Sequence, residues 1–246
     1  MTLVEKITKK AEFISFMASK IDYTILKGAD EKKVAKFCES AKKYGFYALC
    51  TWPEYVKLTS ELLKDSEVKV CSVIGFPEGT MSTASKLKDL EVAIKGGATE
   101  FDMVMERAKF KFLDNYSVRK DIEDVVAEAK KASYNNIVKV IVETCELNYD
   151  EIRKACEIVS DAGADFIKTS TGYKDDFFRS MGEERAKKIE DVRAMKEKID
   201  TMGSRLKIKA AGGIGTLEYA IAMIEAGASR LGIGSAATKI IDEIKY

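Results

Sequence analysis

Short apolar runs alternate with helix-length amphipathic stretches about eight times along this chain. The runs cover residues 21–26, 46–51, 68–76, 100–105, 138–144, 165–171, 206–211 and 229–235. Several of the helical stretches between them end in glycine, as at Gly45 and Gly227, and glycine is the residue that most often terminates a helix. This alternation predicts parallel strands joined by crossover helices, because parallel neighbours need a long connection.

The chain length favours one architecture among the parallel α/β folds. Eight strand–helix units in 246 residues match a (β/α)8 TIM barrel, with an open doubly wound sheet as the alternative. The first 18 residues predict an extra N-terminal helix before the first strand. With two prolines and no low-complexity linker, we expect residues 1–246 to form a single barrel domain.

Charge and residue types exclude several functions. Basic and acidic residues nearly balance, at 41 against 40, and no basic block stands out, so we expect neither nucleic acid nor a membrane as a partner. The N-terminus lacks an apolar signal segment and no run is long enough to span a bilayer, so we expect a cytoplasmic protein. The absence of histidine excludes histidine-ligated metal sites and histidine acid–base catalysis. The five cysteines lack metal-site spacing and are expected to be reduced core thiols.

Two lysines stand near the ends of apolar runs, each just before small residues. Lys168 precedes Thr-Ser-Thr-Gly and Lys209 precedes Ala-Ala-Gly-Gly. Active sites of such barrels lie at the carboxyl ends of the strands, so we expect the two ammonium groups to meet there. Each would disfavour protonation of the other, and a lysine pKa lowered to about 7–8 makes a nucleophile for Schiff-base formation with a carbonyl. The alternative is that both lysines reach solvent or pair with carboxylates.

Asp102 is a carboxylate in the middle of an apolar run. It could pair with Lys209 or relay protons to a substrate, and a structural ion pair is the alternative. Glu143 ends the next run and could hold either lysine in place. We expect Lys207 at the solvated lower end of the barrel and Cys50 in the core.

Two glycine-rich segments lead from the last two runs into helices. Residues 210–216 and 231–238 would place backbone amides at two helix N-termini, where barrels of this class bind phosphate; tight turns are the alternative use. The first segment is not a dinucleotide fingerprint, because Glu218 stands where the third glycine should be. The expected substrate and phosphate site comprises Asp22, Thr24, Ser170, Thr171, Gly172, Gly212, Gly213, Gly234 and Ser235.

Several of these segments together resemble the deoxyribose-phosphate aldolases. They are FIKTSTG with KAAGG downstream, ATEFDMVM, VCSVIGFPEGTMSTASK, KVIVET and IDYTILK. The resemblance implies a class I aldolase without metal or other cofactor, which reversibly cleaves the sugar phosphate 2-deoxy-D-ribose 5-phosphate into D-glyceraldehyde 3-phosphate and acetaldehyde. It implies Lys168 as the Schiff-base lysine, Lys209 as the lysine that perturbs its pKa and Asp102 in proton transfer. It also implies a homodimer or larger homo-oligomer.

The chain departs from the family pattern at several positions. Tyr23 and Gly28 replace the histidine and proline of IDHTLLKP, and residues 105–116 differ from the usual stretch. Gly215 stands where the family often has arginine, which removes one cation from the phosphate site; Lys174 or Arg179 could compensate.

Two other functions therefore stay open. One is a Schiff-base lyase for another sugar phosphate or an unphosphorylated aldehyde, and the other is a non-catalytic sugar-phosphate-binding barrel. Tyr246 could fold over the barrel mouth as a proton donor, although most chain ends are mobile.

Overall fold

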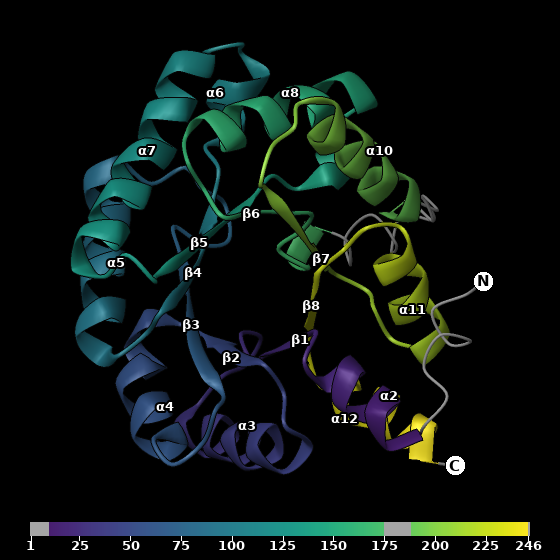
Figure 1. Cartoon of the computed structure of the whole chain (residues 1–246). Coiled ribbons are helices and arrows are strands. Elements are labelled where there is room, and N and C mark those ends of the chain that lie inside the picture. The colour runs from purple at the N-terminus through teal and green to yellow at the C-terminus, as the bar shows by residue number, and fades with distance from the viewer. Residues whose placement is uncertain (1–9, 175–187, 246) are drawn as a thin grey trace.

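A computed structural model of the chain describes residues 10–174 and 188–245. In this part of the chain eight parallel strands close into a barrel, with β1 paired to both β2 and β8, and helices form the outer ring (Figure 1). The (β/α)8 prediction is confirmed and the open sheet is excluded. The strands are β1 (Ile21–Thr24), β2 (Ala48–Thr51), β3 (Lys69–Ile74), β4 (Glu100–Val104), β5 (Ile137–Ile141), β6 (Phe166–Lys168), β7 (Lys207–Ala211) and β8 (Arg230–Ile233).

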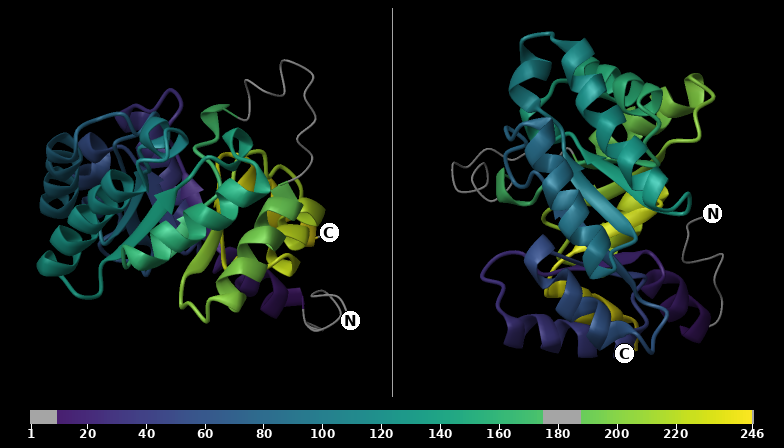
Figure 2. Two further views of the ribbon diagram at one scale, coloured as in Figure 1. Left: turned by 90° about the horizontal axis from the view of Figure 1, so that it is seen from above. Right: turned by 90° about the vertical axis from the view of Figure 1, so that its left-hand side faces the viewer.

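Helices follow the strands and wrap the barrel from outside, as the two side views show (Figure 2). The helix α2 precedes β1 and packs against α12, which confirms an extra N-terminal helix, although residues 1–9 of its expected range lie outside the described residues. The helices are α2 (Lys10–Ala18), α3 (Glu31–Tyr44), α4 (Val56–Leu63), α5 (Thr83–Gly96), α6 (Arg107–Lys111), α7 (Asn115–Ala132), α8 (Tyr149–Asp161), α10 (Lys188–Thr201), α11 (Leu217–Glu225) and α12 (Ala236–Lys245), with 3-10 turns η1 (Pro53–Tyr55) and η2 (Thr144–Glu146).

The helix α3 shows how local sequence sets these elements. The Asp30 side chain caps its first turn by accepting a hydrogen bond from the Lys33 amide at 2.8 Å. The helix ends at Gly45, whose φ of 68° is the left-handed conformation that glycine adopts without strain. Its apolar face buries Val34, Cys38 and Ala41 against the barrel.

The strands are buried almost throughout, because side chains fill the barrel interior and helices cover its outer face. The layer between strands and helices is apolar. The interior also contains buried charged side chains, including Asp22, Asp102, Lys139 and Lys209. Such burial is costly unless the charges pair with one another, so the interior is where a functional site is expected.

Among residues 10–174 and 188–245, no helix has the length and apolar content needed to cross a bilayer.

Candidate active site

A cavity of about 630 Å³ opens at the carboxyl ends of β1, β6, β7 and β8. Sequence reasoning places the site at this end of the barrel. The cavity wall includes eight of the predicted site residues: Thr24, Lys168, Thr171, Gly172, Gly212, Gly213, Gly234 and Ser235.

Lys168 is the last residue of β6, and its buried side chain lies on the cavity wall. Its ammonium nitrogen Nζ lies 2.6 Å from Oδ2 of Asp102, a residue of β4. A buried amine that reaches a cavity and contacts a carboxylate has the two features that carbonyl chemistry requires, which are access to substrate and a partner for its proton.

The carboxylate of Asp102 joins three lysines. Its Oδ2 atom accepts hydrogen bonds from Lys168 and, at 2.7 Å, from Lys209, and its Oδ1 atom accepts one from Lys139 at 3.0 Å. Burial by itself would raise the pKa of Asp102, but the three ammonium groups hold it well below its usual value. Asp102 is therefore an anion in the resting site.

Lys209 lies on β7 and is fully buried. Besides Asp102 it contacts Oδ2 of Asp22 at 2.5 Å. Burial disfavours the charged amine, but the two carboxylates raise the pKa of Lys209 above its ordinary value. The prediction that each lysine disfavours protonation of the other is therefore wrong for Lys209, because the sequence did not show that a carboxylate would lie between the two ammonium groups.

The position of Asp22 also differs from the prediction. Sequence reasoning assigned it to substrate binding, whereas the structure buries it and pairs it with Lys209 and, at 2.7 Å, with Arg230. Burial alone would raise the pKa of Asp22, but Lys209, Lys139 and Arg230 hold it below its usual value. Asp22 is suited to holding Lys209 in place.

Sequence reasoning missed three members of this interior cluster: Glu100, Lys139 and Arg230. Lys139 Nζ lies 2.6 Å from Glu100 Oε2, and Arg230 lies 3.6 Å from the same oxygen. Lys139 itself could have been found as a lysine inside an apolar run, whereas its position opposite Asp102 is set by the register of β4 and β5. The cluster thus combines three carboxylates with four cations, and of these four only Lys168 lines the cavity.

Residues 16–238 match the model of the DeoC/LacD family aldolases. The chain belongs to this aldolase family. A deoxyribose-phosphate aldolase from Caldanaerobacter subterraneus subsp. tengcongensis is 44% identical over 238 residues, which cover 96% of this chain and 97% of the relative. One from Carboxydothermus hydrogenoformans is 46% identical over 220 residues, covering 89% and 91%. The solved structure of the tetrameric deoxyribose phosphate aldolase from Aeropyrum pernix is 29% identical with a TM-score of 0.83, covering 98% of this chain and 94% of that chain.

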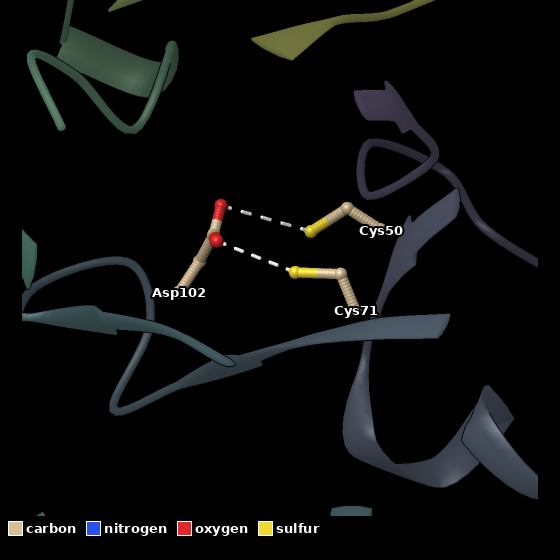
Figure 3. Close-up of side chains that lie close together, drawn as sticks. All are labelled: Cys50, Cys71 and Asp102. Atoms are coloured by element: carbon tan, nitrogen blue, oxygen red, sulfur yellow. Dashed lines mark hydrogen bonds between the residues drawn. The ribbon is translucent and has the colours of Figure 1, made fainter. Parts of the chain in front are cut away.

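In this member of the DeoC/LacD family, two thiols flank the central carboxylate. Cys50 on β2 and Cys71 on β3 both point at Asp102, with Sγ to carboxylate oxygen distances of 3.9 and 3.3 Å (Figure 3). The three residues have ligand types that a metal ion could use. The lysines that already bind both oxygens of Asp102 argue against a cation there. All five cysteines are buried and none forms a disulfide within the described residues, which fits core thiols.

The loop after β6 is held by Glu143. The Glu143 carboxylate accepts hydrogen bonds from the hydroxyl and, at 3.3 Å, from the amide of Thr171, and pairs with Arg107 at 3.3 Å. Glu143 has a φ of 57°. Such backbone strain in a residue other than glycine is typical of functional sites. Glu143 was predicted to hold a lysine; its contacts with Thr171 and Arg107 instead position the segment that forms one side of the cavity.

The remaining hydroxyls of this segment differ in their contacts. Thr169 Oγ1 bridges to β7, accepting from the Ala211 amide at 2.9 Å and donating to the Ala211 carbonyl at 3.1 Å. Ser170 Oγ is buried and has no hydrogen-bond partner among the described residues. Lys188, which sequence reasoning missed, donates to the carbonyls of Ala211 and Gly212 and fixes the glycine turn after β7.

Several departures from the family pattern have structural counterparts. Tyr23 is buried and stacks on Phe37, with ring centroids 4.3 Å apart. Lys207 is exposed, as predicted. Lys174 lies 3.7 Å from Glu78 and 3.9 Å from Glu146 and is absent from the cavity wall, so those carboxylates offset its charge. The other two candidates, Arg179 and Tyr246, lie outside the described residues.

Proposed function

We propose that this chain is a deoxyribose-phosphate aldolase, which cleaves 2-deoxy-D-ribose 5-phosphate reversibly into D-glyceraldehyde 3-phosphate and acetaldehyde. The observation that carries the proposal is the position of Lys168: its amine lies on the cavity wall, 2.6 Å from Asp102. Family membership and two full-length relatives above 40% identity support the same activity.

The reaction begins at Lys168. Its neutral amine nitrogen bonds to C1 of the open-chain sugar, and the carbonyl oxygen leaves as water, giving an iminium ion. The C3 hydroxyl then gives up its proton, the C2–C3 bond breaks, and the bonding electrons move into the iminium. D-glyceraldehyde 3-phosphate leaves, and protonation of C2 followed by hydrolysis releases acetaldehyde and restores the lysine.

Asp102 and Lys209 have different parts in this proposal. Asp102 Oδ2 is within hydrogen-bond distance of Lys168 Nζ, so Asp102 and water pass the lysine proton out of the site and move protons between reacting groups. Lys209 has a raised pKa and stays charged, so its positive charge keeps Asp102 anionic and in place. Lys209 is therefore a positioning residue.

The glycine segments after β7 and β8 are the proposed phosphate site. Gly212, Gly213, Gly234 and Ser235 line the cavity, and the segments lead into α11 and α12. Gly212 and Gly213 have φ values of 83° and 72°, a conformation open to glycine that turns backbone amides toward a bound anion.

We further propose a homo-oligomer, supported by the tetrameric Aeropyrum pernix relative. A cytoplasmic location is supported by five buried cysteines that form no disulfide within the described residues, which suits a reducing compartment.

Borohydride trapping tests the aldolase proposal. The protein is reduced in the presence of 2-deoxyribose 5-phosphate and analysed by intact mass and peptide mapping. We expect a reduced adduct on Lys168 that is lost in Lys168→Ala and kept in Lys207→Ala, the exposed lysine of β7. An adduct with acetaldehyde alone would retain the chemistry but change the substrate. No adduct with either compound would overturn the proposal and favour a non-catalytic binding barrel.

A further inference from the structure

The cavity wall is positively charged. It carries three lysines, Lys27, Lys33 and Lys168, and none of its lining residues within the described part of the chain is acidic. A concave surface of one sign attracts a ligand of the opposite sign. If Lys168 takes the aldehyde end of the substrate, the other two lysines are candidates for its charged end.

Gly215 is the reason why this chain needs another cation to bind the charged end of the substrate. The resemblance to the aldolases implies an arginine at this position, whereas Gly215 lies on the cavity wall without a side chain. A Cβ atom built on Gly215 would meet only the Gly213 carbonyl oxygen, at 3.9 Å, so there is room for a larger residue. A cation is therefore missing from a wall that could accommodate it.

Lys27 is already engaged in holding the cavity wall together. Its ammonium group donates to the Gly172 carbonyl at 3.2 Å and lies 4.8 Å from the centre of the Tyr173 ring. These contacts tie the loop after β1 to the loop after β6. Moving Lys27 to a ligand would break them.

Lys33 is held more weakly. Its side chain is about half exposed; its ammonium group donates to the Gly28 carbonyl at 2.6 Å and lies 3.5 Å from the exposed Asp30 carboxylate. Exposed pairs of this kind contribute little, so an incoming anion can compete for the ammonium group. Gly28, in place of the family's proline, has a φ of 61°, which proline cannot adopt. The Gly28 departure therefore permits the loop conformation that positions Lys33 at the cavity.

The barrel also brings Lys33 to the correct end of the cavity. Lys33 lies in the first turn of α3, the helix that follows β1, and β1 pairs with β8. A Cβ atom on Gly234 would lie 3.6 Å from the Thr24 carbonyl oxygen, so the ends of these two strands are in contact. Lys33 thus lines the same cavity as the glycine segments proposed to bind phosphate.

We propose that Lys33 supplies the cation that binds the substrate's phosphate, in place of the arginine that the family resemblance implies at position 215. This inference rests on the proposed function. It makes Lys33 a specificity residue for phosphorylated over unphosphorylated substrates, and it assigns to Lys33 the compensating charge for which Lys174 was a candidate.

The test compares kcat/KM for 2-deoxyribose 5-phosphate with kcat/KM for 2-deoxyribose. In Lys33→Met we expect this ratio to fall about tenfold, mainly through a higher KM for the phosphorylated sugar, because a charge-assisted hydrogen bond is lost. Lys33→Arg should keep most of the ratio. Lys32→Met, which removes a neighbouring exposed lysine, should keep all of it. Adding Gly215→Arg to Lys33→Met should restore the preference.

The outcomes separate this inference from the proposed function. If the wild-type protein cleaves the phosphorylated sugar but Lys33→Met changes the ratio less than twofold, or Lys32→Met lowers it equally, the inference is wrong. If the wild-type protein cleaves neither sugar, the proposed function fails, and titration with inorganic phosphate followed by NMR decides the inference alone. Phosphate binding about tenfold weaker in Lys33→Met than in Lys32→Met would support it, and equal binding would overturn it.

Discussion

Lys168 and Lys209 are direct register partners on β6 and β7, and their ammonium nitrogens lie 2.6 and 2.7 Å from the same oxygen of Asp102. Two cations so close together would repel each other without the carboxylate between them. When the proton of Lys168 leaves the site for solvent, the interior cluster changes from four cations against three carboxylates to three against three. The cluster is thus balanced in the state in which Lys168 is a nucleophile.

Replacing Lys209 should destabilise the fold. In Lys209→Met, Asp22 keeps Arg230 but loses its 2.5 Å ion pair with Lys209, and Asp102 loses its 2.7 Å contact with the same ammonium group. Two buried carboxylates thus lose an ion-pair partner, so we expect a loss of about 3 kcal/mol in the free energy of unfolding, measured with urea. Lys207→Met removes an exposed lysine from the same strand and should change stability by less than about 0.5 kcal/mol. Equal effects of the two substitutions would contradict the ion-pair account.

Stability should be highest between about pH 5 and 8. The pKa values of Asp22 and Asp102 are lower in the fold, so their contribution is present above the unfolded value near 3.9 and is lost as the pH falls further. Burial raises the pKa of the Cys38 thiol to about 11 and that of Cys156 to about 12. The contribution of these thiols to stability is fully present below the unfolded pKa near 8.5. It is lost as the pH rises through the pKa that each thiol has in the fold.

Urea unfolding over a series of pH values measures both limbs. Asp22→Asn should flatten the acid limb. Cys38→Ala combined with Cys156→Ala should flatten the alkaline limb and leave the acid limb as it is. An alkaline limb that is equally steep in the double variant would show that other groups cause it.

Glu143 should matter for turnover. Glu143→Gln keeps the side-chain size but removes the negative charge that pairs with Arg107 and accepts from Thr171. We expect kcat/KM for 2-deoxyribose 5-phosphate to fall about tenfold, because Thr171 lines the cavity and loses its fixed position. Glu146→Gln is the control. Glu146 reaches the same Arg107 at 3.4 Å from a more exposed position, so its substitution should lower kcat/KM by less than about twofold.

Leu113 offers a stabilising substitution far from the cluster. It follows α6 with a φ of 60° and an exposed side chain, a conformation that glycine adopts without strain. Leu113→Gly should raise the free energy of unfolding by about 0.5–1 kcal/mol, part of the relieved strain being offset by the greater freedom of glycine in the unfolded chain. At the preceding Phe112, φ is −86°, so Phe112→Gly should not stabilise the protein.

The fold could be predicted from the sequence because each strand and helix has its own local pattern. All eight apolar runs contain a strand, although β6 is only Phe166–Lys168, because the following Thr-Ser-Thr-Gly residues form the loop. Lysines within or at the end of apolar runs also carry a local signal, which is why Lys168, the last residue of β6, and Lys209, in the middle of β7, could be found.

The pairing of the interior charges could not be predicted in the same way. Asp22 and Arg230 are 208 residues apart and meet only because β1 closes against β8. Lys139 is a charged residue in the middle of an apolar strand, but its place opposite Asp102 depends on the register of β4 and β5, which no local pattern gives. The pKa of Lys209 was predicted in the wrong direction for the same reason, since it depends on which carboxylates the closed barrel brings to it.

The interior charges are divided between the two halves of the barrel. The carboxylates Asp22, Glu100 and Asp102 all come from β1 and β4, and the cations Lys139, Lys168, Lys209 and Arg230 come from β5 to β8. Each half alone would hold charges of one sign, and a barrel made from two copies of either half would bring like charges together at its centre. The two halves of this barrel are therefore not interchangeable, and each needs the other to neutralise the buried charges at its centre.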